Sequence, residues 1–193
     1  MSISEIIRYV YVTLGVAFIL TIPVLCIRLY ITKGKFKNDS LKHEIASLCF
    51  IFYVLSLFQI TALRFGGLGW SLESMIERRT RVNSEPLVML WDWTVNGVWW
   101  HLFYNVVGNC IWFVPMGFAM PAIYKQLRNN LPFVIFIGMS ISSAIEVLQF
   151  ILCTGVTDID DVIFNTIGTA IGCLLWCLFD KGRNLKNKEQ PAT

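Results

Sequence analysis

Five stretches of the chain are dominated by apolar residues over lengths that suit membrane-spanning helices. A helix rises about 1.5 Å per residue, so about 20 apolar residues cross the roughly 30 Å of hydrocarbon in a bilayer. Apolar residues lie on all sides of these helices, whereas a soluble helix shows a single apolar stripe. The pattern predicts an all-α, polytopic membrane bundle of about five transmembrane helices. The predicted helices cover residues 6–31, 45–63, 101–124, 131–153 and 161–179.

Composition supports the membrane class. Of the 193 residues, 55% are hydrophobic and 15% are charged, and the mean hydropathy is +0.60. Such a chain is too apolar to enclose its side chains in one water-soluble domain. The six cysteines stand singly in apolar stretches, without the spacing of a zinc site, and we interpret them as small buried residues. We expect membrane lipid as a partner and no nucleic acid.

The positions of the basic residues predict the orientation of the helices, because Lys and Arg beside a span are retained on the cytoplasmic side. They cluster after the first, third and fifth stretches. The N-terminus is therefore expected outside and the C-terminus in the cytoplasm. Arg28 lies close enough to the inner end of the first span for its charge to reach water. The clusters are Lys33, Lys35, Lys37 and Lys42, then Lys125 and Arg128, then Lys181, Arg183, Lys186 and Lys188.

This orientation divides the chain into four segments. Residues 1–64 form two N-terminal transmembrane helices, and residues 65–100 form an extracytoplasmic segment. Residues 101–180 form a three-helix core. Residues 181–193 form a cytoplasmic tail, which we expect to be disordered because it is polar and terminal.

The extracytoplasmic segment ends in a tryptophan-rich stretch with Trp91, Trp93, Trp99 and Trp100. Tryptophan prefers the headgroup layer of a membrane, because its ring is apolar and its N–H is polar. Two interpretations remain open. The stretch is either an aromatic belt that fixes the depth of the helices or a platform that receives a lipid or glycolipid.

Polar side chains in the last three predicted helices fall on single helix faces, three or four residues apart. Counted from the outer helix ends, Asn109 and Glu146 lie roughly 10 Å into the membrane and Asn165 about 6 Å. Amide and ionisable groups at such a depth normally face the interior of a bundle. We predict that they meet in the outer half of the membrane and bind a ligand. The candidate ligand-binding residues are Asn105, Asn109, Ser142, Gln149 and Asn165.

Glu146 is the candidate catalytic residue. A carboxyl group with apolar neighbours suits a general acid or base, since desolvation shifts its proton affinity. Alternatively, Glu146 is a buried side chain that amides on neighbouring helices satisfy, so that it holds the helices together. Gly168 and Gly172 form a G-x-x-x-G surface, which predicts close helix packing.

The run Thr157-Asp158-Ile159-Asp160-Asp161 adds carboxylates at the rim of this cluster. Asp158 and Asp161 are candidate ligands of a divalent cation, because hard cations prefer carboxylate oxygens. Carboxylates at this position also cap a following helix and favour the positive end of its dipole. Both interpretations remain open, so a divalent cation is a candidate cofactor.

Two ordered motifs resemble the VanZ-like family. The first is N-x-x-x-N-x-x-x-F-x-P-x-G from Asn105 to Gly117. The second is S-x-x-x-E-x-x-Q from Ser142, followed by G-x-T-D-I-D-D-V-x-x-N-T-x-G from Gly155. Together they cover about 70 residues. Arg81, ahead of Asn83 and Pro86, loosely resembles a further family element, which makes it a candidate ligand-binding residue.

The resemblance implies an integral protein of the bacterial cell membrane, associated with resistance to glycopeptides of the teicoplanin type. Three functions follow as hypotheses. The first is a protein that engages the acylated drug or a lipid-linked cell-envelope precursor at the outer leaflet. The second is an intramembrane enzyme, metal-assisted or not, that modifies a lipid-linked envelope substrate. The third is a lipid transporter or scramblase, since polar residues in a bundle also mark pathways.

Overall fold

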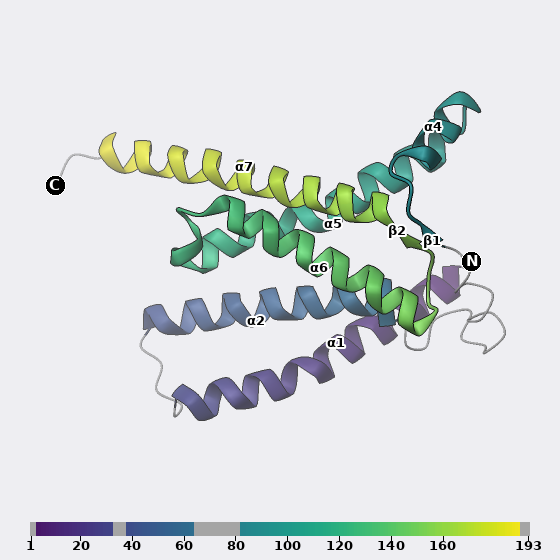
Figure 1. Cartoon of the computed structure of the whole chain (residues 1–193). Coiled ribbons are helices and arrows are strands. Elements are labelled where there is room, and N and C mark those ends of the chain that lie inside the picture. Colours follow the sequence, from purple (N-terminus) through teal and green to yellow (C-terminus); the bar gives the residue numbers. More distant parts are fainter. Residues whose placement is uncertain (1–2, 33–37, 64–81, 190–193) are drawn as a thin grey trace. The chain divides into compact units, whose positions relative to one another are not determined.

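A computed structural model describes residues 3–32, 38–63 and 82–189 (Figure 1). The chain divides into two compact units. The first unit comprises Met1–Asn83 and Ala144–Asp158, and the second comprises Ser84–Ser143 and Ile159–Thr193. Helix α6 (Leu131–Leu152) begins in the second unit and ends in the first.

Within the described residues, five helices are long and apolar enough to cross a membrane, as the sequence predicts. The orientation of the helices and of the two termini stays a prediction. Their candidate spans are Ile7–Ile31, Leu41–Leu63, Asn105–Ile123, Leu131–Leu152 and Ile159–Arg183.

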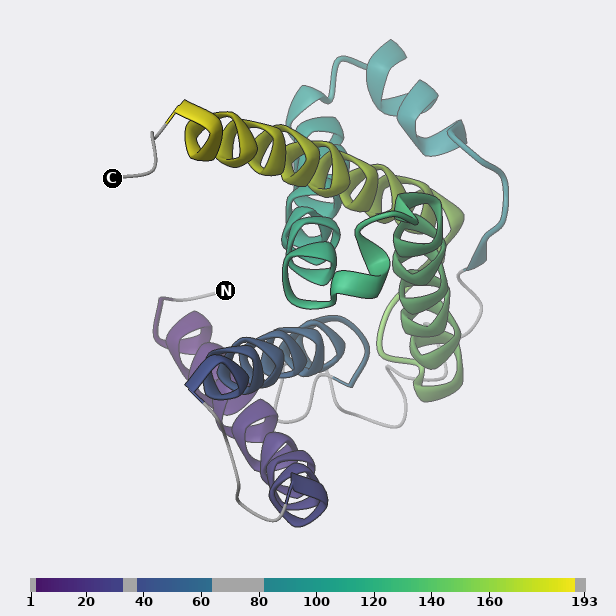
Figure 2. The same cartoon turned by 90° about the vertical axis from the view of Figure 1, so that its left-hand side faces the viewer.

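The first unit contains the helical hairpin of α1 (Ile3–Thr32) and α2 (Asn38–Phe58), which pack against each other (Figures 1 and 2). The last turn of the second span is a π-helix, Gln59–Leu63. Large apolar side chains of α1, among them Tyr11 and Phe18, are exposed on its outer faces. Such a surface suits lipid, because hydrocarbon solvates it as well as protein does.

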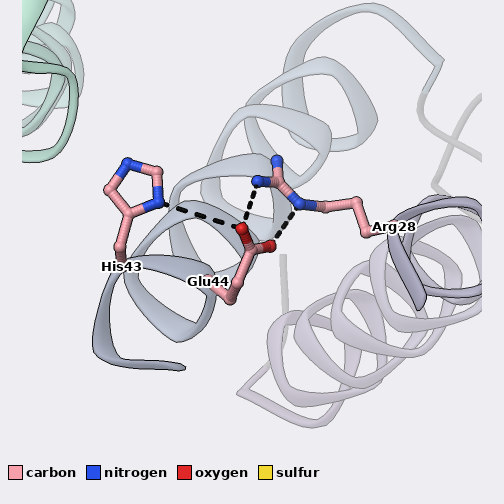
Figure 3. Close-up of polar contacts among 3 residues, drawn as sticks. All are labelled: Arg28, His43 and Glu44. Atoms are coloured by element: carbon pink, nitrogen blue, oxygen red, sulfur yellow. Dashed lines mark hydrogen bonds and ion pairs between the residues drawn. The ribbon is translucent and has the colours of Figure 1, made fainter. Parts of the chain in front are cut away.

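Arg28 and Glu44 join the two helices of this hairpin (Figure 3). Arg28 donates from Nε to Glu44 Oε2 at 2.5 Å and from Nη2 to Glu44 Oε1 at 2.8 Å. His43 Nδ1 lies 3.9 Å from the same carboxylate. The sequence alone predicts an Arg28 side chain that reaches toward water. The structure shows a bidentate ion pair, the strongest geometry for this pair of groups, while the Arg28 side chain stays 29% exposed.

The described part of the first unit also contains a two-residue parallel ladder. Strand β1 (Val82–Asn83) pairs with β2 (Thr157–Asp158), with Val82 opposite Thr157 and Asn83 opposite Asp158. No apolar alternation marks these strands, so the sequence did not predict them. This pairing places residues 82–83 beside the loop that follows α6.

The second unit is built on α5 (Trp99–Ile123) and α7 (Ile159–Glu189), which lie against each other (Figure 2). Added Cβ atoms would come within 2.2 Å of a backbone carbonyl oxygen at Gly117, Gly168 and Gly172. Only glycine permits this approach of two backbones. The close packing predicted from Gly168 and Gly172 is therefore present, and Gly117 completes it from α5.

The sequence predicts a disordered tail over residues 181–193. Helix α7 continues to Glu189, so residues 181–189 are helical, and residues 190–193 lie outside the described part of the chain. The reason is local. Good helix formers such as Leu185 and Lys186 extend a helix that is already nucleated, and the first proline after the span is Pro191. The short helix α4 (Val88–Val95) precedes α5 in the same unit.

Candidate functional site

Two hydrogen-bonded pairs line α7 in the second unit. Asn109 Nδ2 on α5 donates a short hydrogen bond to Asp161 Oδ1. Asn165 Nδ2 donates to Ser142 Oγ on α6 at 2.8 Å, and both residues are buried. Asp161 and Asn165 are one helical turn apart, so the two pairs follow each other along one face of α7. We call Asn109, Ser142, Asp161 and Asn165 the paired cluster.

The paired cluster joins three predicted ligand-binding residues to one predicted metal ligand. Asn105, one turn before Asn109 on α5, is half-buried and already takes part in an interaction. Arg81, the remaining candidate from the family motif, lies outside the described residues. A ligand-binding role for all of these residues stays a prediction.

Glu146 belongs to the first unit and closes the loop after α6. Its carboxylate oxygen Oε2 accepts the backbone N–H of Asp158 at 2.8 Å, and its backbone oxygen accepts Thr157 Oγ1 at 3.4 Å. Asn83 Nδ2 in turn donates to Asp158 Oδ1 at 2.8 Å. Glu146 is only 5% exposed. This hydrogen bond gives the Glu146 carboxylate a structural role. Contact of Glu146 with Asn109 and Asn165, which belong to the second unit, stays a prediction.

Gln149 also lies in the first unit, where its side chain donates a hydrogen bond to the π-helical end of the second span. The last carbonyl groups of a helix have no partner within the helix. Here three consecutive carbonyl oxygens receive side-chain donors. Tyr9 Oη donates to Ile60 at 2.7 Å, Gln149 Nε2 to Thr61 at 3.2 Å, and Thr154 Oγ1 to Ala62 at 2.5 Å. The amide oxygen of Gln149 is buried and has no hydrogen-bond partner in the described part of the chain.

The three carboxylates at the end of β2 and the start of α7 accept hydrogen bonds from different donors. Asp158 accepts from Asn83, Asp161 accepts from Asn109, and Asp160 Oδ1 accepts the backbone N–H of Leu87 at 2.7 Å. Asp160 and Asp161 lie in the first turn of α7, where negative charge is favoured by the helix dipole. Across the described residues, no three His, Cys, Asp or Glu side chains gather to hold a metal ion. The position of Asp160 and Asp161 agrees with the helix-dipole interpretation. The divalent cation stays a prediction.

Sequence reasoning missed Asp160, which is buried and anchors α4. Leu87, the residue before α4, has a φ of 64°, a left-handed conformation that is costly for a residue with a side chain. The hydrogen bond from Leu87 to Asp160 helps to hold it. A left-handed leucine has no signature in sequence, although Pro86 before it marks a turn.

A groove of about 480 Å³ lies between α4 and α5 in the second unit. Its lining is apolar, and Trp99 contributes an exposed ring to it. Trp91 and Trp100, which follow the lining residues Leu90 and Trp99 in sequence, are 70% and 72% exposed. Exposed tryptophans on both helices agree with the aromatic belt and with the lipid platform alike. The groove is lined by Leu90, Trp99, Leu102, Phe103, Val106 and Val107.

Comparison with known proteins agrees with the motif assignment. A sequence model of the VanZ/LLP1 family matches residues 50–180, more than half of the chain. Protein VanZ of Enterococcus faecium is 35% identical over 88 residues, which are 46% of this chain and 53% of that protein. The chain thus matches about half the length of this relative. No solved structure matches it significantly. With its membrane-length helices and the motifs from Asn105 to Gly172, the chain is a multi-pass membrane protein that belongs to the VanZ/LLP1 family.

Proposed function

We propose that the chain is a VanZ-like binding protein of the bacterial cell membrane that contributes to resistance to lipoglycopeptide antibiotics of the teicoplanin type. It does so by engaging the acylated drug or a lipid-linked cell-envelope precursor at the outer leaflet. The observation that carries the proposal is the apolar groove between α4 and α5, beside exposed tryptophans. Family membership and the predicted orientation support it.

The groove suits an acyl chain. Its lining residues offer apolar surface over about 480 Å³, and exposed tryptophans favour the headgroup depth at which a lipid-linked molecule enters. Transfer of an acyl chain from lipid to an apolar groove gains little by itself, because lipid tails are equally apolar. Selectivity must therefore come from polar groups near the groove.

Helix α5 carries both kinds of group. Leu102, Phe103 and Val106 line the groove, and Asn105 and Asn109 lie on the adjoining face of the same helix. An amphiphile with its chain in the groove would have its polar part beside these amides. A sugar or peptide group of the ligand that leaves water here needs a hydrogen-bond partner, and an amide can offer one through the donors or acceptors that its present contacts do not use.

The test is direct binding to the purified protein. Teicoplanin should bind, and its deacylated form should bind at least tenfold more weakly. Val106→Trp, which fills the groove, should reduce both binding and the resistance of cells that express the protein. Ile111→Trp is the matched control, because Ile111 lies on α5 and is exposed. Equal binding of the acylated and deacylated drug, or binding of neither the drug nor a lipid-linked precursor, would refute the proposal.

An enzyme is the second hypothesis, with Glu146 as acid or base and Asp158 and Asp161 as metal ligands. It receives less support, because each of these carboxylates already accepts a hydrogen bond that closes a loop, joins two strands or joins two helices. A chelator-sensitive change in the lipid-linked envelope precursors of expressing cells would favour it. Lipid flux in proteoliposomes would favour the third hypothesis, a transporter or scramblase.

A further inference from the structure

A second pocket lies at the other end of the second unit, between the turn after α5 and the last turns of α7. Its volume is about 460 Å³, and its lining differs from that of the apolar groove. Arg128 and Lys181 bring positive charge, Asn129 brings an amide, and Trp176 and Leu185 bring apolar surface. The family motifs do not include these residues.

Arg128 is held in a fixed position. Its Nε donates to the backbone oxygen of Pro121 at 3.0 Å and its Nη2 to that of Ala122 at 3.2 Å, so it caps the end of α5. Its guanidinium carbon lies 5.4 Å from the centre of the Trp176 ring. A guanidinium has five N–H groups, and within the described residues these hydrogen bonds use two of them. The others remain to bind an anion, and little side-chain entropy is lost when they do.

The floor of the pocket is equally rigid. Trp176 is 5% exposed and packs edge-on against Phe118, with ring centres 5.8 Å apart. Phe179 contacts both rings, at 5.8 Å from Phe118 and 6.0 Å from Trp176. The ring on which Arg128 rests is therefore fixed by its neighbours.

The charge of the pocket favours an anion. The pocket lining contains two cationic side chains, Arg128 and Lys181, and one carboxylate, that of Asp180, which already takes part in an interaction. The depth favours a lipid. Lys181 lies two residues before the end of the fifth candidate span at Arg183, and Arg128 follows the end of the third at Ile123 by five residues. Both cations thus lie where lipid headgroups are found, whichever way the chain is oriented.

We propose that this pocket binds the phosphate group of an anionic membrane lipid, through Arg128, Lys181 and the amide of Asn129. Trp176 and Leu185 cover the glycerol and upper acyl carbons. The site is separate from the groove between α4 and α5, and it does not depend on the function proposed for that groove. It would fasten α7 to the turn after α5 at the membrane surface.

The experiment measures lipid binding to the full chain by native mass spectrometry. Protein in zwitterionic detergent should take up one phosphatidylglycerol per chain in preference to phosphatidylcholine. Lys181→Gln should weaken this binding about fivefold, as expected for the loss of one cation at a headgroup. Arg183→Gln is the matched control, because it removes the same charge two residues away, outside the pocket, and should change binding less than twofold.

Arg128→Lys separates a built site from general attraction, because lysine keeps the charge but cannot bridge two carbonyls and a phosphate. It should weaken binding more than Lys181→Gln does. Equal losses in Lys181→Gln and Arg183→Gln would overturn the proposal, as would no preference for phosphatidylglycerol. Inorganic phosphate alone is the remaining probe. If it bound as tightly as the lipid and showed the same dependence on Lys181, the lipid assignment would be overturned in favour of a free anion.

Discussion

The N-terminal hairpin and the α5–α7 pair join membrane helices in opposite ways. In the most apolar part of the α1 span only 11% of residues are buried, against 39% in that of α7. The hairpin relies on the ion pair between Arg28 and Glu44, whereas α5 and α7 approach until their backbones touch at glycines. In lipid, apolar contact adds little net attraction, so association needs either close packing or polar pairs. The family match begins at residue 50 and so includes the glycine-packed pair but not α1.

The largest effect is expected where the glycine packing is broken. In Gly172→Ala, the new methyl group would lie 2.1 Å from the backbone oxygen of Val114, and neither backbone can move without shifting a whole helix. We expect a loss of about 3 kcal/mol in the free energy of unfolding. Gly108→Ala is the control, because a Cβ there meets nothing within 4 Å. Unfolding in detergent measures both, and equal stability of the two variants would mean that α5 and α7 are not closely packed.

The ion pair of the hairpin should matter less. Arg28→Gln leaves the Glu44 carboxylate, whose side chain is 12% exposed, without its partner, and we expect a loss of about 1 to 2 kcal/mol. Arg8→Gln removes an exposed charge from the same helix and should change stability little. A double-mutant cycle with Glu44→Gln measures the coupling directly. Additive losses in the two single variants would show that the pair does not join the helices.

The contact of Asp160 with Leu87 should have a local effect of about 1 kcal/mol, the typical net contribution of one hydrogen bond. In Asp160→Ala, hydrogen exchange should rise in α4, residues 88–95, and stay unchanged in the hairpin. Asp92→Ala, in α4 itself, is the control for a general change of charge. Unchanged exchange in α4 would show that Asp160 does not anchor this helix.

The smallest effect is expected for a single neutral hydrogen bond in the hairpin. Tyr9→Phe removes the donor to the carbonyl of Ile60, and hydrogen bonds between membrane helices contribute about 0.6 kcal/mol on average. Tyr11→Phe, at a side chain that is 73% exposed, should have no effect. A loss in Tyr9→Phe as large as in Gly172→Ala would reverse the contrast between the two regions.

The sequence identifies several residues of the candidate site but not which of them contact one another. Asn109, Ser142 and Asn165 were recognised because amides and hydroxyls in apolar helices are costly and so need partners. Their actual partners were not predicted. Asn109 pairs with Asp161, one of the two candidate cation ligands, and Ser142 on α6 pairs with Asn165 on α7. Periodicity identifies the face of a helix, but not the side chain that meets it from another helix.

The sequence by itself determined the number of membrane-length helices, their approximate bounds and the family, because these depend on local hydropathy and on ordered motifs. The tertiary structure decided which groups satisfy one another. Glu146 holds the backbone of Asp158, Gln149 caps the π-helical end of the second span, and Asp160 anchors α4. The physical reason is that hydropathy acts residue by residue along the chain. A hydrogen bond between distant residues, such as that of Gln149 with Thr61, depends on helix packing that brings two positions within about 3 Å.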